Sequence, residues 1–127
     1  MDQGPLNILI VDDDIPITLF MKKIVTGEGH RAFVSPNSAK ANDVLKAEKI
    51  NIALCDLVLP GADGSDIIKE IKKSDPNIYC VLFSGYYDVS FDNYKVLVGA
   101  DEVIGKPVTK ETVQAIIQHY FEKRSAS

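Results

Sequence analysis

A single carboxylate, Asp56, lies inside a run of apolar residues that is otherwise typical of a buried strand. Apolar residues 52–55 precede it and apolar residues 57–59 follow it, before Pro60 and Gly61 interrupt the run. An ionised carboxylate is costly to bury unless it is paired, protonated or bound to a metal. The rest of the chain must therefore supply partners for Asp56, which limits how the chain can fold.

The length and charge of the chain bound the kind of molecule it forms. Its 127 residues, 46% hydrophobic and 25% charged, suffice for one globular domain with a single core. We expect one domain over residues 1–127, with a core at about 7–121 and a polar tail at 122–127. A net charge of −4 and the lack of a Lys/Arg block argue against direct binding to nucleic acid or an anionic membrane. No secretory signal or membrane-spanning run is visible, so we expect a cytoplasmic protein.

Five short apolar runs alternate with amphipathic segments along the chain. The runs are typical of strands buried on both faces of a sheet, and apolar residues recur at helical spacing between them. The expected strands are 6–11, 31–35, 52–59, 78–83 and 101–104. Helices are expected from Pro16 to Gly27, at 39–48, between the loop 61–65 and Asp75, at 89–98, and around 113–121. This alternation predicts an α/β fold, a doubly wound five-stranded parallel sheet with helices on both faces.

Polar side chains collect where the predicted strands end. The residues concerned are Asp12 and Asp13 after the first strand, Asp56 late in the third, Ser84 after the fourth and Lys106 after the fifth. In an open parallel sheet these strand ends face one crevice, where ligands bind. Four separate segments therefore direct polar groups at one place.

The chemistry of these side chains favours a metal and a phosphoryl group. Carboxylates gathered in a crevice repel one another, so one must protonate unless a cation lies among them. All donors are oxygen atoms, which favours Mg²⁺, or Mn²⁺ in its place, over zinc. Lys106 and Ser84 would then supply the charge and the hydroxyl that hold an incoming phosphoryl group, and Asp56 would be the nucleophile.

Each of these residues also has an ordinary explanation. The acidic run 12–14 is typical of a solvated helix cap, Ser84 of a turn and Lys106 of a solvent-facing side chain. Asp56 resists such an explanation best, because apolar residues flank it on both sides. The coincidence of all of them at successive strand ends is what favours a site.

Four stretches, taken in order, resemble the receiver domain of two-component response regulators, which has a chemotaxis-regulator-like, flavodoxin-like fold. They are ILIVDDD at 8–14, LCDLVLPGADG at 54–64, FSGY at 83–86 and GADEVIGKP at 99–107. The resemblance extends from about Asn7 to Phe121. It implies the strand order 2-1-3-4-5 and a phosphoacceptor function in phosphorelay signalling.

The resemblance also implies partners and a metal. Asp56 would accept a phosphoryl group from a sensor histidine kinase or a histidine phosphotransfer protein, and a downstream effector protein or domain would respond. The chain would catalyse its own phosphorylation and dephosphorylation only, and would not be an enzyme for other substrates. Asp13, Asp56 and the backbone carbonyl of Val58 would bind Mg²⁺, with Asp12 helping directly or through water.

Further roles follow from the same resemblance. Lys106 would contact the acyl phosphate, Ser84 would swing in to bond it, and a cis peptide would join Lys106 to Pro107. Val58 and Tyr86 occupy positions that, in such domains, flank the path of the hydrolytic water. Because one is apolar and the other bulky, slow self-dephosphorylation is expected.

The chain departs from the family pattern at Val103, where a tyrosine or phenylalanine usually precedes the motif lysine by three residues. The aromatic rotamer switch is therefore missing, and Val108 replaces a common phenylalanine after Lys106 and Pro107. The sequence leaves open the kinase, the signal, the output partner, the oligomeric state, and whether this is a whole regulator or a piece of a longer one.

Three alternatives fit part of the pattern. Asp12 and Asp14 form an Asp-x-Asp pair like that of haloacid-dehalogenase-like phosphohydrolases, as nucleophile and general acid, but Asp56 then lacks a comparable role. A flavodoxin-like cofactor binder needs a donor-rich loop after the first strand, where this chain has acids. A receiver-like interaction module that is not phosphorylated is favoured by Val103 and by the weak helical pattern at 89–98.

Overall fold

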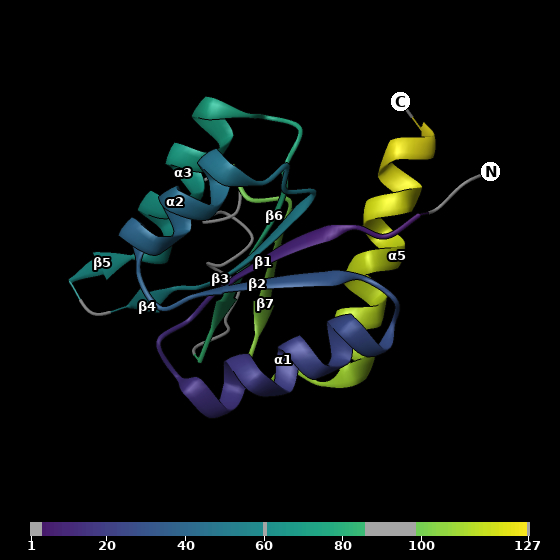
Figure 1. Cartoon of the computed structure of the whole chain (residues 1–127), viewed down its shortest axis with the longest axis horizontal. Coiled ribbons are helices and arrows are strands. Elements are labelled where there is room, and N and C mark those ends of the chain that lie inside the picture. Colours follow the sequence, from purple (N-terminus) through teal and green to yellow (C-terminus); the bar gives the residue numbers. More distant parts are fainter. Residues whose placement is uncertain (1–3, 60, 86–98, 127) are drawn as a thin grey trace.

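The computed structural model describes residues 4–59, 61–85 and 99–126 of the chain (Figure 1). The main sheet consists of β1 (Asn7–Val11), β2 (Arg31–Ser35), β3 (Ile52–Asp56), β6 (Tyr79–Ser84) and β7 (Glu102–Gly105). A separate antiparallel hairpin consists of β4 (Val58–Leu59) and β5 (Ala62–Asp63). The helices are α1 (Ile15–Gly27), α2 (Ser38–Ala47), α3 (Gly64–Ser74) and α5 (Lys110–Ala126).

The sheet has the order β2-β1-β3-β6-β7, and every neighbouring pair is parallel. This confirms the predicted order 2-1-3-4-5 once the two hairpin strands are left out of the numbering. From β1 the chain first crosses to β2 on one side and later to β3 on the other. The carboxyl ends of β1 and β3 therefore flank the point where the strand order reverses, which is where such sheets bind ligands.

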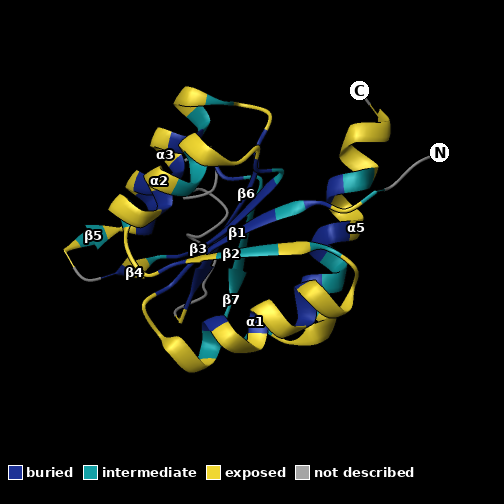
Figure 2. Ribbon diagram, viewed as in Figure 1, coloured by how far each residue is buried: buried dark blue, intermediate teal, exposed yellow. Residues whose placement is uncertain are grey.

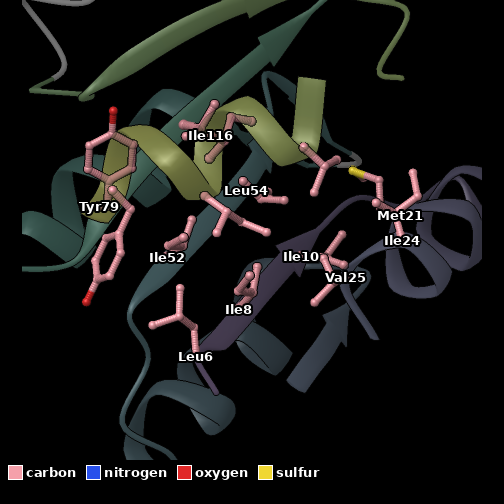
Figure 3. Packing of buried hydrophobic residues seen from close by; sticks show 14 of the residues in the cluster. Leu6, Ile8, Ile10, Met21, Ile24, Val25, Ile52, Leu54, Tyr79 and Ile116 are labelled. Carbon is pink, nitrogen blue, oxygen red and sulfur yellow. The ribbon is translucent and has the colours of Figure 1, made fainter. Parts of the chain in front are cut away.

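Two apolar layers hold the sheet between helices, because successive residues of a strand face opposite sides. Ile10 and Leu54 belong to the layer that packs against α1 and α5, part of which Figure 3 shows. Leu9 and Leu82 belong to the layer that packs against α2 and α3. The central strands β1, β3 and β6 are almost entirely buried (Figure 2), which confirms the doubly wound architecture.

Helices α1, α2 and α3 each begin at a capping residue, close to the helix starts expected from the sequence. Asp14 caps α1 by accepting a hydrogen bond from the Ile17 amide at 3.2 Å, with Pro16 in the first turn. Asn37 caps α2 and Asp63 caps α3 in the same way. The segments after β1, β2 and the β4–β5 hairpin therefore lead directly into their helices.

The third strand is shorter than predicted. It ends at Asp56 rather than at residue 59, and the apolar residues that follow form the hairpin β4–β5. The expected loop at 61–65 is therefore wrong, since α3 already begins at Gly64. Hydrophobicity continues through this turn, so the apolar run alone did not mark the strand end.

The carboxyl-terminal residues also differ from the prediction. Helix α5 continues to Ala126, so residues 122–126 of the expected polar tail are exposed but still helical. These residues are good helix formers, and Lys123 and Arg124 make side-chain contacts with the domain, Arg124 over the ring of Tyr120. The helix expected at 89–98 lies outside the described residues.

The first helix exposes more apolar surface than its helical spacing suggests. Phe20 is 47% exposed and Leu19 is 60% exposed, although Met21 and Val25 on the same helix are buried.

Among the described residues, no helix combines the length and the apolar character needed to cross a membrane.

A charged network holds the amino-terminal end of β7 to its neighbours. The Asp101 carboxylate pairs with Lys72 at 2.7 Å and with Lys123, and it accepts a hydrogen bond from the Cys80 amide at 2.8 Å. Burial alone would raise the pKa of Asp101, but the two lysines and this hydrogen bond outweigh it and lower the pKa below its ordinary value. Asp101 thus links α3, β6 and α5.

Asp101→Asn is expected to lower the free energy of unfolding at pH 7 by about 1–3 kcal/mol, because two lysines lose their charged partner. A depressed pKa gives stability that is present above the unfolded value of 3.8 and is lost as the pH falls through the folded pKa. The difference between mutant and wild type, measured by urea unfolding, should therefore shrink in acid. The exposed control Asp43→Asn should have little effect at either pH; an equal loss in both variants would contradict this role.

Candidate functional site

The carboxyl ends of β1 and β3 bring three carboxylates together. One oxygen atom each from Asp12, Asp13 and Asp56 lies within 4.8 Å of the others. Asp12 is 3% exposed and Asp56 is 8% exposed, whereas Asp13 faces solvent. The sequence placed these residues at strand ends, and the fold converts that placement into a compact acidic group.

Lys106 lies beside this acidic group. Its ammonium nitrogen is 3.1 Å from Asp56 Oδ1 and 4.0 Å from Asp12 Oδ2. Lys106 follows β7, at the edge of the sheet, yet its side chain reaches across to the carboxylate on β3. A nearly buried charge needs a partner of opposite charge at short range. The ion pair with Lys106 therefore explains how the Asp56 carboxylate can lie at the end of an apolar strand.

One lysine does not neutralise the three acids. Burial raises the pKa of the Asp12 carboxyl, and the charges of Asp56 and Asp13 act in the same direction. The Asp14 amide, which donates to Asp12 Oδ1 at 2.9 Å, and the charge of Lys106 oppose this rise. The remaining negative charge and the all-oxygen donor set suit a hard divalent cation.

Ser84 and Lys106 are coupled through the backbone. Ser84 ends β6, is buried, and stands opposite Gly105 of β7. Its carbonyl oxygen accepts a hydrogen bond from the Lys106 amide at 2.7 Å. The Lys106–Pro107 peptide bond is cis. Ser84, which carries the hydroxyl, and Lys106, which carries the ammonium group, are thus held next to each other at the carboxyl ends of adjacent strands.

Backbone hydrogen bonds fix the exit of the chain from Asp56. The Leu57 amide donates to the Phe83 carbonyl at 2.8 Å, and the Gly64 amide donates to the Leu57 carbonyl at 2.7 Å. A Cβ atom at Gly64 would lie 1.9 Å from the carbonyl oxygen of Asp56. Only glycine allows α3 to begin so close to the carboxylate-bearing strand end.

The remaining predicted residues have different surroundings. Asp14 is exposed and caps α1, so its carboxylate is not part of the acidic group. The Val58 side chain is 69% exposed on the hairpin that follows Asp56. Val103 is partly buried against the apolar layer under α2 and α3. Tyr86 lies outside the described residues.

A family model described as response regulator receiver domain matches residues 8–118 of the chain. The chain belongs to the response regulator receiver domain family. Sporulation initiation phosphotransferase F of Bacillus subtilis (strain 168) is 28% identical over 119 residues, 94% of this chain and 96% of that protein. The resemblance inferred from the sequence motifs is therefore confirmed.

Other relatives of this receiver domain are longer proteins. A cyclic di-GMP phosphodiesterase of Thermotoga maritima is 29% identical over 94% of this chain but only 32% of its own length. Among solved structures, a CheY-like receiver domain protein from Methanospirillum hungatei JF-1 is 26% identical with a TM-score of 0.87, covering 98% of this chain and 100% of that one. The receiver domain thus occurs in relatives both alone and joined to further segments.

Two features of the receiver domain escaped the sequence reasoning. Gly64 was included in a motif but not identified as the residue that permits the close approach of α3, although a glycine just before an amphipathic helix is a usable signal. The exposure of Phe20 and Leu19 was also missed, because helical spacing does not say how wide the buried face of a helix is.

Gly64→Ala should displace the amino-terminal end of α3 or the carbonyl of Asp56, because the new Cβ overlaps that oxygen. We expect a loss of about 1–3 kcal/mol in the free energy of unfolding, as for other overpacked sites, measured by denaturant titration. Gly27→Ala is the matched control, since no atom lies within 4 Å of a Cβ there. Equal stability of the two variants would show that α3 can shift without cost.

Proposed function

We propose that Asp56 is the phosphoacceptor of this receiver domain. The observation that carries the proposal is the ion pair of Asp56 with Lys106 inside the group formed with Asp12 and Asp13. A carboxylate that is nearly buried, held by a lysine and surrounded by metal-binding oxygens is poised for phosphoryl transfer rather than for structural pairing alone.

In the proposed reaction, a carboxylate oxygen of Asp56 attacks the phosphorus of a phosphohistidine on a sensor histidine kinase or a histidine phosphotransfer protein. The phosphorus–nitrogen bond breaks, the imidazole leaves with the electron pair, and an acyl phosphate forms. Lys106, 3.1 Å from the carboxylate, then has a phosphoryl oxygen as its new partner. Ser84 contributes its hydroxyl from the end of the neighbouring strand.

A divalent cation, Mg²⁺ or Mn²⁺, would neutralise charge on the transferring phosphoryl group. Asp13 and Asp56 would hold it, together with the backbone carbonyl of Val58, and Asp12 would assist. Asp13 is the exposed member of the group, so it is open to a hydrated ion, whereas Asp12 orients the loop through the Asp14 amide. The excess of carboxylates over ammonium groups supports this fit.

The output of the domain is proposed to be a change of binding surface read by a downstream effector protein or domain. Val103 is an aliphatic residue on β7, so an aromatic rotamer cannot report the reaction there. The coupled pair of Ser84 and Lys106 supplies the alternative, because a movement of either residue strains the hydrogen bond between their backbones. We place this activity in the cytoplasm and restrict its chemistry to the domain's own acyl phosphate.

The phosphoacceptor is tested by incubating the protein with Mg²⁺ and acetyl phosphate and measuring its intact mass. Wild type should gain the mass of one phosphoryl group and Asp56→Asn should gain none, because the nucleophilic oxygen is lost. Asp66→Asn, an exposed acid in the first turn of α3, is the matched control and should behave as wild type. A mass gain that persists in Asp56→Asn would overturn the proposal. If Asp56→Asn keeps the mass gain and a second variant, Asp12→Asn, loses it, the result would favour the phosphohydrolase alternative.

The metal is tested by titrating Mg²⁺ while following backbone amide chemical shifts. Asp13→Asn should weaken Mg²⁺ binding by about tenfold or more, because one carboxylate ligand is replaced by a neutral amide. Asp14→Asn is the control: it lies next in the chain, and asparagine caps a helix as well as aspartate does. Equal affinities of the two variants for Mg²⁺ would contradict the proposed ligand set.

A further inference from the structure

Two small hollows adjoin at the edge of the sheet opposite the acidic site. Their volumes are about 250 and 170 Å³, and they share Asn77, Tyr120 and Arg124. Residues 49–51 line the first hollow and lead into β3, and Asn77 leads into β6, so both hollows lie at the amino-terminal ends of the strands. The last turns of α5 reach this edge (Figure 1). We call the two hollows together the basal pocket.

The basal pocket is basic, although the chain as a whole is acidic. Four basic side chains line it, Lys49, Lys72, Lys123 and Arg124, against two acidic ones, Asp75 and Asp101. The chain as a whole has a net charge of −4. A local excess of two positive charges therefore favours an anionic ligand at this edge.

The two acids of the basal pocket are already engaged. The Asp101 carboxylate holds both of the lysines described above, and Asp75 accepts a hydrogen bond from the Asn77 amide at 3.0 Å. Lys49, in contrast, forms no ion pair with a described residue. Arg124 lies 5.5 Å from the centre of the Tyr120 ring, which keeps its charge at the pocket. The positive charge left for a ligand therefore lies on the side of the first hollow.

A nearly buried hydroxyl group also lacks an acceptor there. Tyr120 is 3% exposed, and its hydroxyl oxygen accepts a hydrogen bond from Asn51 Nδ2 at 3.2 Å. The direction of that bond is fixed, because Asn51 Oδ1 accepts from the Asn7 amide at 2.8 Å. No described residue accepts the hydrogen of the Tyr120 hydroxyl. Because Tyr120 and Asn51 both line the first hollow, this donor is available to a ligand bound in it.

We propose that the basal pocket binds a small phosphate monoester. The Tyr120 hydroxyl donates to a phosphoryl oxygen in the first hollow, and Lys49 and Arg124 neutralise the charge of the phosphate. A phosphate monoester carries a charge of about −1.5 to −2 at pH 7, which matches the local excess of positive charge. The second hollow takes the organic part, beside Tyr79 and Pro76.

Such a ligand would link the segment before β3 to the last turns of α5. It would lie at the opposite edge of the sheet from Asp56, so its binding requires neither Mg²⁺ nor the phosphoacceptor. The basal pocket is therefore a second site, independent of the proposed phosphoryl transfer.

The pocket is tested by titrating glycerol 3-phosphate into the full chain without Mg²⁺ while following backbone amide chemical shifts. Saturable shifts are expected at Asn51, Asn77 and Arg124, and these should be larger than any at Asp13. Glycerol should cause none, and inorganic phosphate should bind more weakly because it leaves the second hollow unfilled. Equal affinities for phosphate and glycerol 3-phosphate, or no saturable shift at the basal pocket, would overturn the proposal.

Two variants identify the groups that hold the phosphate. Lys49→Gln and Tyr120→Phe should each weaken binding by about tenfold, because each removes a donor to the phosphate. Lys46→Gln is the matched control: it removes the same charge from an exposed lysine on α2, three residues away, and should stay within about twofold of wild type. Equal weakening by Lys46→Gln and Lys49→Gln would show general charge attraction and overturn the site. Asp56→Asn should bind glycerol 3-phosphate as wild type does, and loss of binding there would contradict a separate pocket.

Discussion

Burial of the Asp56 and Asp12 carboxylates at the carboxyl ends of β3 and β1 is the constraint on which the rest of the site depends. Two acids that have almost no access to water require a cation at short range, and Lys106 supplies the only one that the described chain places within 4.0 Å of both. That contact in turn requires β7 to end next to β6, with the Lys106 amide bonded to Ser84. The sheet order and the site are therefore two aspects of one arrangement.

Ion pairs hold β7 at both of its ends. Before the strand, Asp101 joins Lys72 and Lys123, and after it Lys106 joins Asp56. Glu102 at the first position of the strand also accepts a hydrogen bond from the Tyr79 hydroxyl at 2.6 Å. If Lys106 exchanges its carboxylate partner for a phosphoryl oxygen, the strand can respond mainly at its carboxyl end, because the other end is tied to α3, β6 and α5. The loop at Pro107 is next to that end, beside Ile17 and Phe20 of α1.

Much of the fold follows from local patterns. Alternating apolar runs and amphipathic segments predicted the parallel sheet, its two helical layers and four of its helices. Asp14 and Asn37, residue types that favour helix caps, begin α1 and α2. The strand end at Asp56 was misplaced, because Leu57, Val58 and Leu59 remain apolar after the backbone has left the sheet. Residue type alone does not mark a strand end, which is set by where the hydrogen bonds with the neighbouring strand stop.

The sequence by itself determined which chemical groups occupy the strand ends: three acids, a serine and a lysine, in an order that indicated a receiver domain. Only the tertiary structure decided that Lys106 lies 3.1 Å from Asp56, that Gly64 must lack a side chain, and that Phe20 faces outward into a groove. These are relations between segments far apart in the chain. Residue type and spacing fix the local backbone and the buried face, but the packing of whole elements sets which distant side chains meet.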